Sequence, residues 1–210
     1  MNGYEAYKSE VRFRFARLLS FSSKESAELA DGIIKKYGSI ENAMCADISE
    51  ISDFSGEGTA CFLKLCASLI SRRRTDALVF GRAYAEREIA EYLKGLFTGL
   101  SVETVFALFY DKDGRLLSCK QVGLGTVNAS EIITRRVVEY ALREGAAAVD
   151  IAHNHPRGSA RPSKDDMNMT TMLEGLFKSA GVELLSHYVV AGQDYTRLFP
   201  SMDFTIFDIK

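Results

Sequence analysis

The stretch AHNHPRGSARPSKDD, residues 152–166, gathers the scarcest residue types of this sequence. The chain has only three histidines, and two of them, His153 and His155, stand in this stretch with one residue between them. Two of its only three prolines, Pro156 and Pro162, lie in the same stretch. This clustering indicates a functional site rather than a simple connection between two elements.

Metal binding is the chemistry that the two histidines favour. They end the run AAAVDIAH, residues 146–153, which predicts a buried strand, and positions two apart on a strand project to one face. Asp166 lies in the first turn of the next predicted helix, and the two prolines would stiffen the loop that folds this helix start back onto the strand end. Two imidazoles and a carboxylate form a ligand set for Zn²⁺ that leaves a fourth position for water. Asp165 is the neighbouring candidate, but adjacent helix positions point about 100° apart, so the two aspartates would not bind together.

Ser163 precedes Asp166 by three residues, and this spacing is compatible with two roles. A serine followed at the third position by an acidic residue is typical of a helix N-cap. A hydroxyl beside a metal site is also suited to stabilise an oxyanion. The two roles do not exclude each other.

A zinc hydrolase also needs a general base, commonly a glutamate that is not a ligand. Glu103 and Glu183 stand near the starts of predicted strands and are the two candidates. Glu131 and Glu139 lie on a predicted helix, where we expect them to face solvent. Spacing alone does not choose between the first two.

The sequence from about residue 100 onward predicts an α/β (α+β) domain. Two strands joined by a turn at 112–114 come first, then a helix over 129–144, the strand that ends on His153, and a helix over 163–180. Further strands are predicted within 182–190 and 195–199. This order predicts a mixed sheet flanked by helices over 99–210.

The preceding part of the chain reads as helical. We expect a helical domain over 1–75 and a linking helix within 76–98. A net charge of −2 and a pI of about 6.0 do not point to nucleic acid as the main partner. Four cysteines without a C-x-x-C pair, the lack of an apolar segment long enough to span a bilayer, and an N-terminus without a signal-peptide core together predict a cytoplasmic protein with no membrane partner.

The pattern His153-x-His155-Pro156 followed by Ser163-x-x-Asp166 resembles the JAMM motif of JAB/MPN metalloproteins, and residues 152–166 resemble the RadC family in particular. The segments VGLGTVNAS at 122–130 and SHYVVAG at 186–192 extend the likeness. The late strand of the family usually reads Asp-His, whereas here Ser186 precedes His187. The resemblance covers about residues 100–200.

This resemblance implies a JAB/MPN-like fold and a zinc metallohydrolase. By it, His153, His155 and Asp166 would hold Zn²⁺, and Glu103, which fills the family's position before an early strand, would deprotonate the water. Ser163 would steady the tetrahedral intermediate. Members of known activity cleave peptide or isopeptide bonds, so a peptide or protein substrate is expected.

Two other interpretations remain. Residues 47–74 resemble a degraded helix-hairpin-helix region, which would suit a DNA-associated accessory protein in repair or recombination with a non-catalytic metal site. Glu57, between Gly56 and Gly58, would repel a DNA phosphate at the hairpin turn, so a helical packing module is the better reading. A binuclear hydrolase would also start from His-x-His, but it needs further histidines and only His187 remains. His187 could lie just behind the site, but a structural role on its strand is the better reading.

Overall fold

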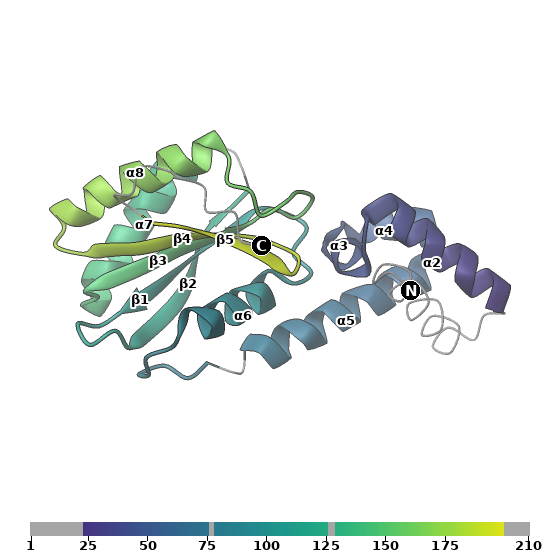
Figure 1. Ribbon diagram of the computed structural model, residues 1–210, viewed down its shortest axis with the longest axis horizontal. Coiled ribbons are helices and arrows are strands. Elements are labelled where there is room, and N and C mark those ends of the chain that lie inside the picture. Colours follow the sequence, from purple (N-terminus) through teal and green to yellow (C-terminus); the bar gives the residue numbers. More distant parts are fainter. Residues whose placement is uncertain (1–22, 76–77, 126–128, 200–210) are drawn as a thin grey trace. The chain divides into compact units, whose positions relative to one another are not determined.

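The computed structural model describes residues 23–75, 78–125 and 129–199, and over these residues it contains seven helices and five strands (Figure 1). The chain divides into two compact units, Met1–Ala67 and Ser68–Lys210. The division falls within helix α5 (Glu57–Thr75), so the C-terminal end of this helix belongs to the second unit. None of the described helices combines the length and the apolar character needed to cross a membrane.

The described part of the first unit is helical, in agreement with the sequence. Helix α2 (Ser23–Tyr37) is followed by α3 (Ile40–Cys45), α4 (Ile48–Ser55) and the start of α5. Asp47 caps α4 by accepting a hydrogen bond from the Ser49 backbone N–H at 2.9 Å. The chain turns from α4 into α5 at Gly56, whose φ of +84° is one that other residues rarely adopt. Glu57 then lies in the first turn of α5, where its negative charge suits the helix N-terminus.

The second unit is built on a five-stranded mixed sheet, which confirms the predicted fold class. Its strands are β1 (Thr104–Tyr110), β2 (Leu116–Leu124), β3 (Ala148–Asn154), β4 (Glu183–Ala191) and β5 (Asp194–Leu198). Their order in the sheet is β2-β1-β3-β4-β5. The neighbours β3 and β4 are parallel, and the other pairs are antiparallel.

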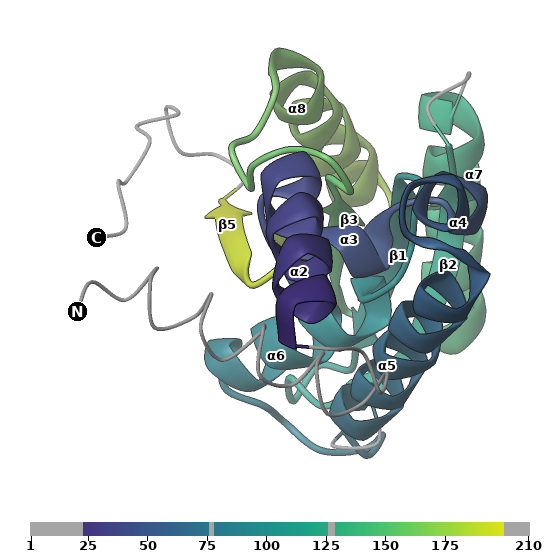
Figure 2. The ribbon, with the colours of Figure 1, turned by 90° about the vertical axis from the view of Figure 1, so that its right-hand side faces the viewer.

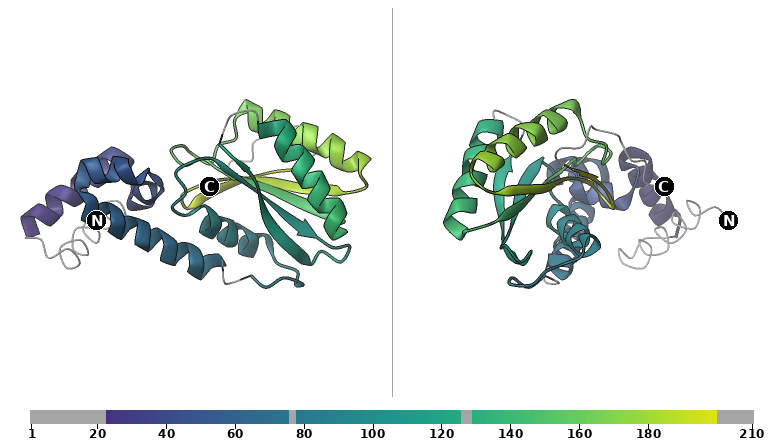
Figure 3. Two further views of the ribbon diagram at one scale, coloured as in Figure 1. Left: turned by 180° about the vertical axis from the view of Figure 1, so that it is seen from behind. Right: turned by 60° about the vertical axis from the view of Figure 1, so that its left-hand side comes forward.

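Helices cover both faces of the sheet. Helices α7 (Ala129–Glu144) and α8 (Lys164–Ser179) lie on one face (Figure 2), and α6 (Glu86–Phe97) lies on the other (Figure 3). The linking helix expected within 76–98 is α6. It begins only at Glu86, and its apolar side is packed against the sheet. Strand β3 is buried along its whole length because it has a helix layer on each side.

Alternate residues of β3 enter two different cores. Val149 and Ile151 pack with α7 and α8, whereas Ala148 and Ala152 pack with α6. This alternation directs His153, the next odd-numbered position, toward the face that carries α8. The sheet thus determines which helix the first histidine meets.

Candidate metal centre

His153 and His155 stand side by side at the C-terminal end of β3. The extended backbone continues one residue past the strand, since the His155 N–H donates to the Val190 carbonyl of β4 at 2.8 Å. The two imidazoles therefore project to the same face, with ring centroids 4.9 Å apart. His153 is buried, whereas the ring of His155 remains partly open to solvent.

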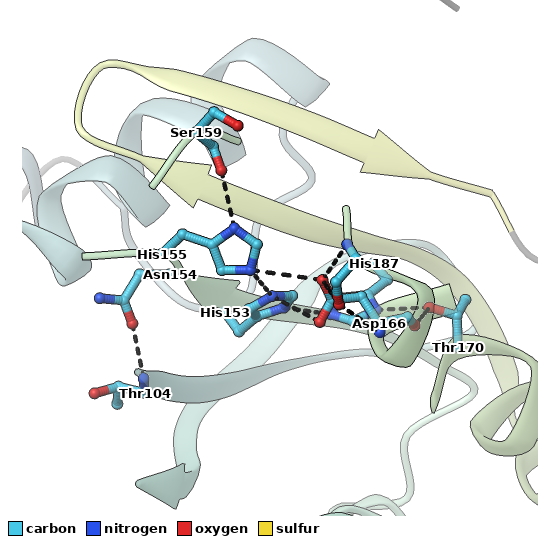
Figure 4. Close-up of polar contacts among 9 residues, drawn as sticks. Thr104, His153, Asn154, His155, Ser159, Asp166, Thr170 and His187 are labelled. Carbon is cyan, nitrogen blue, oxygen red and sulfur yellow. Dashed lines mark hydrogen bonds and ion pairs between the residues drawn. The ribbon is translucent and has the colours of Figure 1, made fainter. Parts of the chain in front are cut away.

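Helix α8 brings Asp166 to the two histidines (Figure 4). Asp166 Oδ1 lies 3.1 Å from His153 Nε2, and Asp166 Oδ2 lies 3.5 Å from His155 Nε2. The two Nε2 atoms are 3.0 Å apart. One donor atom from each residue falls within a group spanning at most 4.8 Å. The alternative, Asp165, is exposed and is not part of this group.

These spacings fit a tetrahedral zinc ion. Donor atoms at the usual zinc distance of about 2.0–2.1 Å lie about 3.3 Å from one another in a tetrahedron. The two nitrogens, 3.0 Å apart, lie close to that value, and Asp166 offers a different oxygen to each ring, Oδ1 at 3.1 Å from His153 and Oδ2 at 3.5 Å from His155. The donor set is also chemically suitable, because zinc binds imidazole nitrogen and carboxylate oxygen.

The protonation of His155 is determined by the loop that follows it. His155 Nδ1 lies 2.9 Å from the Ser159 backbone carbonyl, which can only accept a hydrogen bond. Nδ1 must therefore carry the proton, and in the neutral ring Nε2 keeps a free lone pair directed at the group. When the ring is protonated, Nε2–H donates to Asp166, and this hydrogen bond raises the pKa of His155 although partial burial opposes it.

Asp166 is held in its ionised form. Burial by itself raises the pKa of this carboxyl, but the hydrogen bonds with His153 and His155 outweigh burial and hold the pKa well below its usual range. Asp166 Oδ2 also accepts hydrogen bonds from the Ser163 backbone N–H and from the Ser163 hydroxyl, both at 2.7 Å. The carboxylate that faces the histidines is therefore negative and fixed in position.

Ser163 is the N-cap of α8. Its hydroxyl oxygen accepts from the Asp166 N–H at 3.1 Å, so the two residues form a reciprocal capping box. The Ser163 hydroxyl proton is directed at Asp166 in this arrangement, and the side chain is exposed. The capping role is thus present, and the oxyanion role stays a prediction.

Glu103 lies immediately before β1, next to the end of β3. Val105 pairs with His153 in the antiparallel ladder, so the segment of Glu103 runs beside the end of β3. The pKa of His155 is raised mainly by its hydrogen bond with Asp166, and the negative charge of Glu103 adds to this to a lesser extent.

The side chain of Asn154 binds the residues on both sides of Glu103: Oδ1 accepts from the Thr104 N–H at 2.7 Å, and Nδ2 donates to the Val102 carbonyl at 3.3 Å. Asn154, which sequence reasoning missed, therefore ties the segment of Glu103 to the histidine strand.

The other glutamates lie away from this group. Glu183 pairs with Ala148 in the parallel ladder, at the opposite end of β3 from His153. Glu139 is exposed on α7, as expected, and the side chain of Glu131 is outside the described part of the structure. Of the two candidates for the base, only Glu103 is near the histidines.

His187 is the remaining histidine of the chain, and the sequence favoured a structural role for it over a place behind the site. It is fully buried on β4, with Nε2 2.7 Å from His153 Nδ1 and Nδ1 2.7 Å from the Thr170 hydroxyl of α8. Burial, together with the neighbouring His153, lowers the pKa of His187 to about 3. His187 therefore stands directly behind the predicted ligands.

A bulge in β4 directs His187 to this face. Val149 pairs with Leu184 and Asp150 with Ser186, so one extra residue, Leu185, stands between the two pairs. Without it, Leu184 and His187 would face opposite sides of the sheet, because side chains alternate along a strand. No pattern in the sequence marks this bulge.

The comparisons with known proteins identify the family of this chain. Residues 83–201 match the family model of the RadC-like JAB domain. The chain is 31% identical over 179 residues to a UPF0758 protein of Janthinobacterium sp. (strain Marseille), an alignment that covers 84% of this chain and 80% of the relative. A UPF0758 protein of Cupriavidus pinatubonensis is 32% identical over 174 residues, covering 81% and 76% of the two chains. The chain therefore belongs to the RadC-like JAB domain family.

Proposed function

We propose that this protein is a zinc-dependent hydrolase that cleaves a peptide or isopeptide bond. The convergence of His153 Nε2, His155 Nε2 and the Asp166 carboxylate is the observation that supports it most directly. The two nitrogens are 3.0 Å apart, and the carboxylate places Oδ1 3.1 Å from His153 and Oδ2 3.5 Å from His155. A carboxylate held ionised against two imidazoles, close to a glutamate outside the group, is the arrangement that such chemistry requires. Membership of a JAB domain family supports the substrate class.

His153, His155 and Asp166 would hold the metal. A bound zinc ion supplies a Lewis acid and lowers the pKa of a water molecule toward about 7. Zn²⁺ suits the set better than Mg²⁺ or Ca²⁺, because those ions prefer ligands that are all oxygen. The partly open ring of His155 would keep the group accessible to substrate.

Glu103 would act as the general base and later as the general acid. Its carboxylate accepts a proton from the attacking water and returns it to the leaving nitrogen, which must be protonated to depart as an amine. Asn154 holds the backbone on both sides of Glu103, so the carboxylate would keep its position relative to the histidines. A general acid–base residue of this kind contributes about 10²–10⁴ in rate.

Ser163 would steady the oxyanion of the tetrahedral intermediate. To do so its hydroxyl must turn from Asp166 Oδ2 toward the substrate. The Ser163 backbone N–H still holds the same carboxylate oxygen at 2.7 Å, so Asp166 would not lose its position when the hydroxyl turns. The serine is thus able to serve the helix cap in the resting protein and the reaction when substrate is bound.

The test has a metal arm and a catalytic arm. Protein loaded with zinc and passed through a desalting column should keep about one zinc per chain by elemental analysis, because the group has three protein ligands. Cleavage is then measured on a library of internally quenched peptides that includes lysine-linked isopeptides. Glu103→Gln should keep the zinc and lose about 10²–10⁴ in rate.

Glu139→Gln is the matched control, because it makes the same change on the exposed side of α7. It should keep both the zinc and the rate. A protein that retains no zinc after loading would overturn the proposed function. Full activity in Glu103→Gln would remove Glu103 from its role.

A further inference from the structure

A buried chain of hydrogen bonds runs behind His153 and returns to the helix that carries Asp166 (Figure 4). We propose that Thr170 and His187 are positioning residues that hold the proton of His153 on Nδ1 and leave Nε2 free to bind a metal. The inference rests on the proposed function for its purpose, because a free Nε2 matters only if the site holds a cation. It adds two residues to the site that are not ligands.

The chain begins at the Thr170 hydroxyl. Thr170 Oγ1 lies 2.7 Å from the backbone carbonyl of Asp166, one turn earlier in α8, and a carbonyl oxygen can only accept. The single hydroxyl proton of Thr170 is therefore used in this bond. The second contact of Oγ1, with His187 Nδ1 at 2.7 Å, must then be one in which Thr170 accepts and His187 Nδ1–H donates.

The next link follows from the neutrality of His187. Its side chain is fully buried, and its two ring nitrogens contact a neutral hydroxyl and another imidazole. A buried imidazolium without a carboxylate against it is strongly disfavoured. With its one proton on Nδ1, His187 accepts at Nε2, so the 2.7 Å contact is a hydrogen bond donated by His153 Nδ1–H.

In the neutral ring, the form that binds a metal, the Nε2 atom of His153 is then left without a proton. This atom is the one that faces Asp166 Oδ1 at 3.1 Å and His155 Nε2 at 3.0 Å. His155 reaches the same form by a shorter route, through its bond with the Ser159 carbonyl. Two nitrogen lone pairs and a carboxylate oxygen thus meet with no proton among them, an arrangement that favours a cation at their centre.

The two arrangements, the Ser159 carbonyl for His155 and the Thr170–His187 chain for His153, differ in how firmly they hold the imidazole. The Ser159 carbonyl belongs to the half-exposed loop after β3, whereas Thr170 and His187 have no exposed surface. The buried route also ends on the backbone of Asp166, so the residue that supplies the carboxylate anchors the tautomer of the histidine it faces. Movement of α8 would therefore disturb the carboxylate and the tautomer together.

The test compares two adjacent threonines of α8. Thr170 and Thr171 each donate to the carbonyl four residues earlier, at 2.7 and 3.1 Å, but only Thr170 contacts His187. Thr170→Val and Thr171→Val therefore each remove one hydrogen bond from a threonine hydroxyl to the carbonyl four residues earlier. Only Thr170→Val also breaks the hydrogen-bond chain behind His153. Thr170→Ser restores a hydroxyl without the methyl group.

Zinc affinity is measured by competition with a chromophoric chelator. Loss of a group that orients a ligand typically weakens metal binding about 10–100-fold, which we expect for Thr170→Val. Thr171→Val should remain within about two-fold of the unmodified protein, and Thr170→Ser should recover most of the affinity because the orienting hydroxyl is kept. Equal affinities for the two valine variants would overturn the proposal.

A second readout needs no metal. In the metal-free protein, ¹⁵N chemical shifts of the imidazoles should show His153 protonated at Nδ1, and Thr170→Val should introduce the Nε2–H form. Finding His153 as Nε2–H in the unmodified protein would overturn the proposal. This readout also separates the two hypotheses: failure to bind zinc would defeat the proposed function, while the tautomer would still decide the roles of Thr170 and His187.

Discussion

Strands β3 and β4 carry a polar network on each face of the sheet. The two networks differ in whether each acceptor atom meets a hydrogen-bond donor. On the α6 face, Asp150 accepts hydrogen bonds from the hydroxyls of Tyr110 and Ser186, both at 2.8 Å. Arg197 Nε donates in turn to the Ser186 oxygen at 2.6 Å. Each carboxylate oxygen of Asp150 thus meets an O–H donor, whereas on the α8 face the acceptor atoms of His153, His155 and Asp166 converge on one another.

The two buried carboxyls show the difference in their protonation. Burial raises the pKa of Asp150, and the hydrogen bonds from Ser186 and Tyr110 offset only part of this effect. Burial acts in the same direction on Asp166, but two imidazoles reverse the result. Asp150, which accepts from two neutral hydroxyls, tends toward its neutral form and stabilises the fold. Asp166, which lies against two imidazoles, stays ionised and is suited to bind a cation. The comparison teaches that burial alone does not distinguish a structural carboxyl from a ligand.

The largest expected effect is the stabilisation of the folded protein by zinc, which should depend on the α8-face network and not on the α6-face network. Zinc at 1,000 times its Kd should stabilise the protein by about 4 kcal/mol, because it binds only the folded state. His155→Ala should lose nearly all of this gain, whereas Asp150→Asn should keep it. Thermal unfolding with and without zinc measures the gain for each variant. Loss of the zinc response in Asp150→Asn would break the distinction between the two faces.

A smaller effect is expected when a donor is removed on the α6 face. Tyr110→Phe leaves Asp150 Oδ2 without its hydroxyl partner, and an unsatisfied buried polar group costs about 1–3 kcal/mol. Denaturant unfolding should show this loss, and zinc affinity should not change. Tyr140→Phe is the control, because Tyr140 is only partly buried on α7 and packs against Phe109 by its ring. A marked fall in zinc affinity for Tyr110→Phe would show that the two networks are coupled.

The smallest effect concerns pH. Because the pKa of Asp150 is raised in the folded state, its contribution to stability is fully present below the unfolded pKa and is lost as pH rises through the folded value. Asp150→Asn does not titrate and escapes this loss. The Tm of the variant relative to the unmodified protein should therefore increase from pH 4 to pH 8. A Tm difference that stays constant or decreases would contradict the raised pKa.

Much of the fold was predictable because it depends on local patterns. Apolar alternation and turn residues indicated the strands, and their order indicated a mixed sheet, which the structure confirms. The range 76–98 does contain the expected helix, but its start at Glu86 depends on packing against the sheet, and residues 78–85 are not helical. The spacing of His153, His155 and Asp166 also predicted their meeting, because a strand end, a short stiff loop and a helix start leave few other arrangements.

The residues around the predicted ligands depend on contacts between distant segments. Spacing alone left Glu103 and Glu183 equal and the family resemblance chose Glu103, while the parallel register of β3 and β4 carries Glu183 to the far end of the sheet. Asn154 lies between the two histidines, but its role follows from the pairing of β1 with β3. His187 reaches the site only because the bulge at Leu185 reverses the facing of the rest of β4.

The sequence by itself determined the secondary structure, the mixed sheet and the three candidate ligands, because each follows from short-range spacing along one segment. Spacing did not decide which glutamate stands beside the histidines, which the family resemblance indicated, and only the tertiary structure decided which hydrogen-bond chain supports His153. Those outcomes depend on strand register and on one extra residue in β4. Register is set by the packing of whole strands and helices, so no local pattern reveals it.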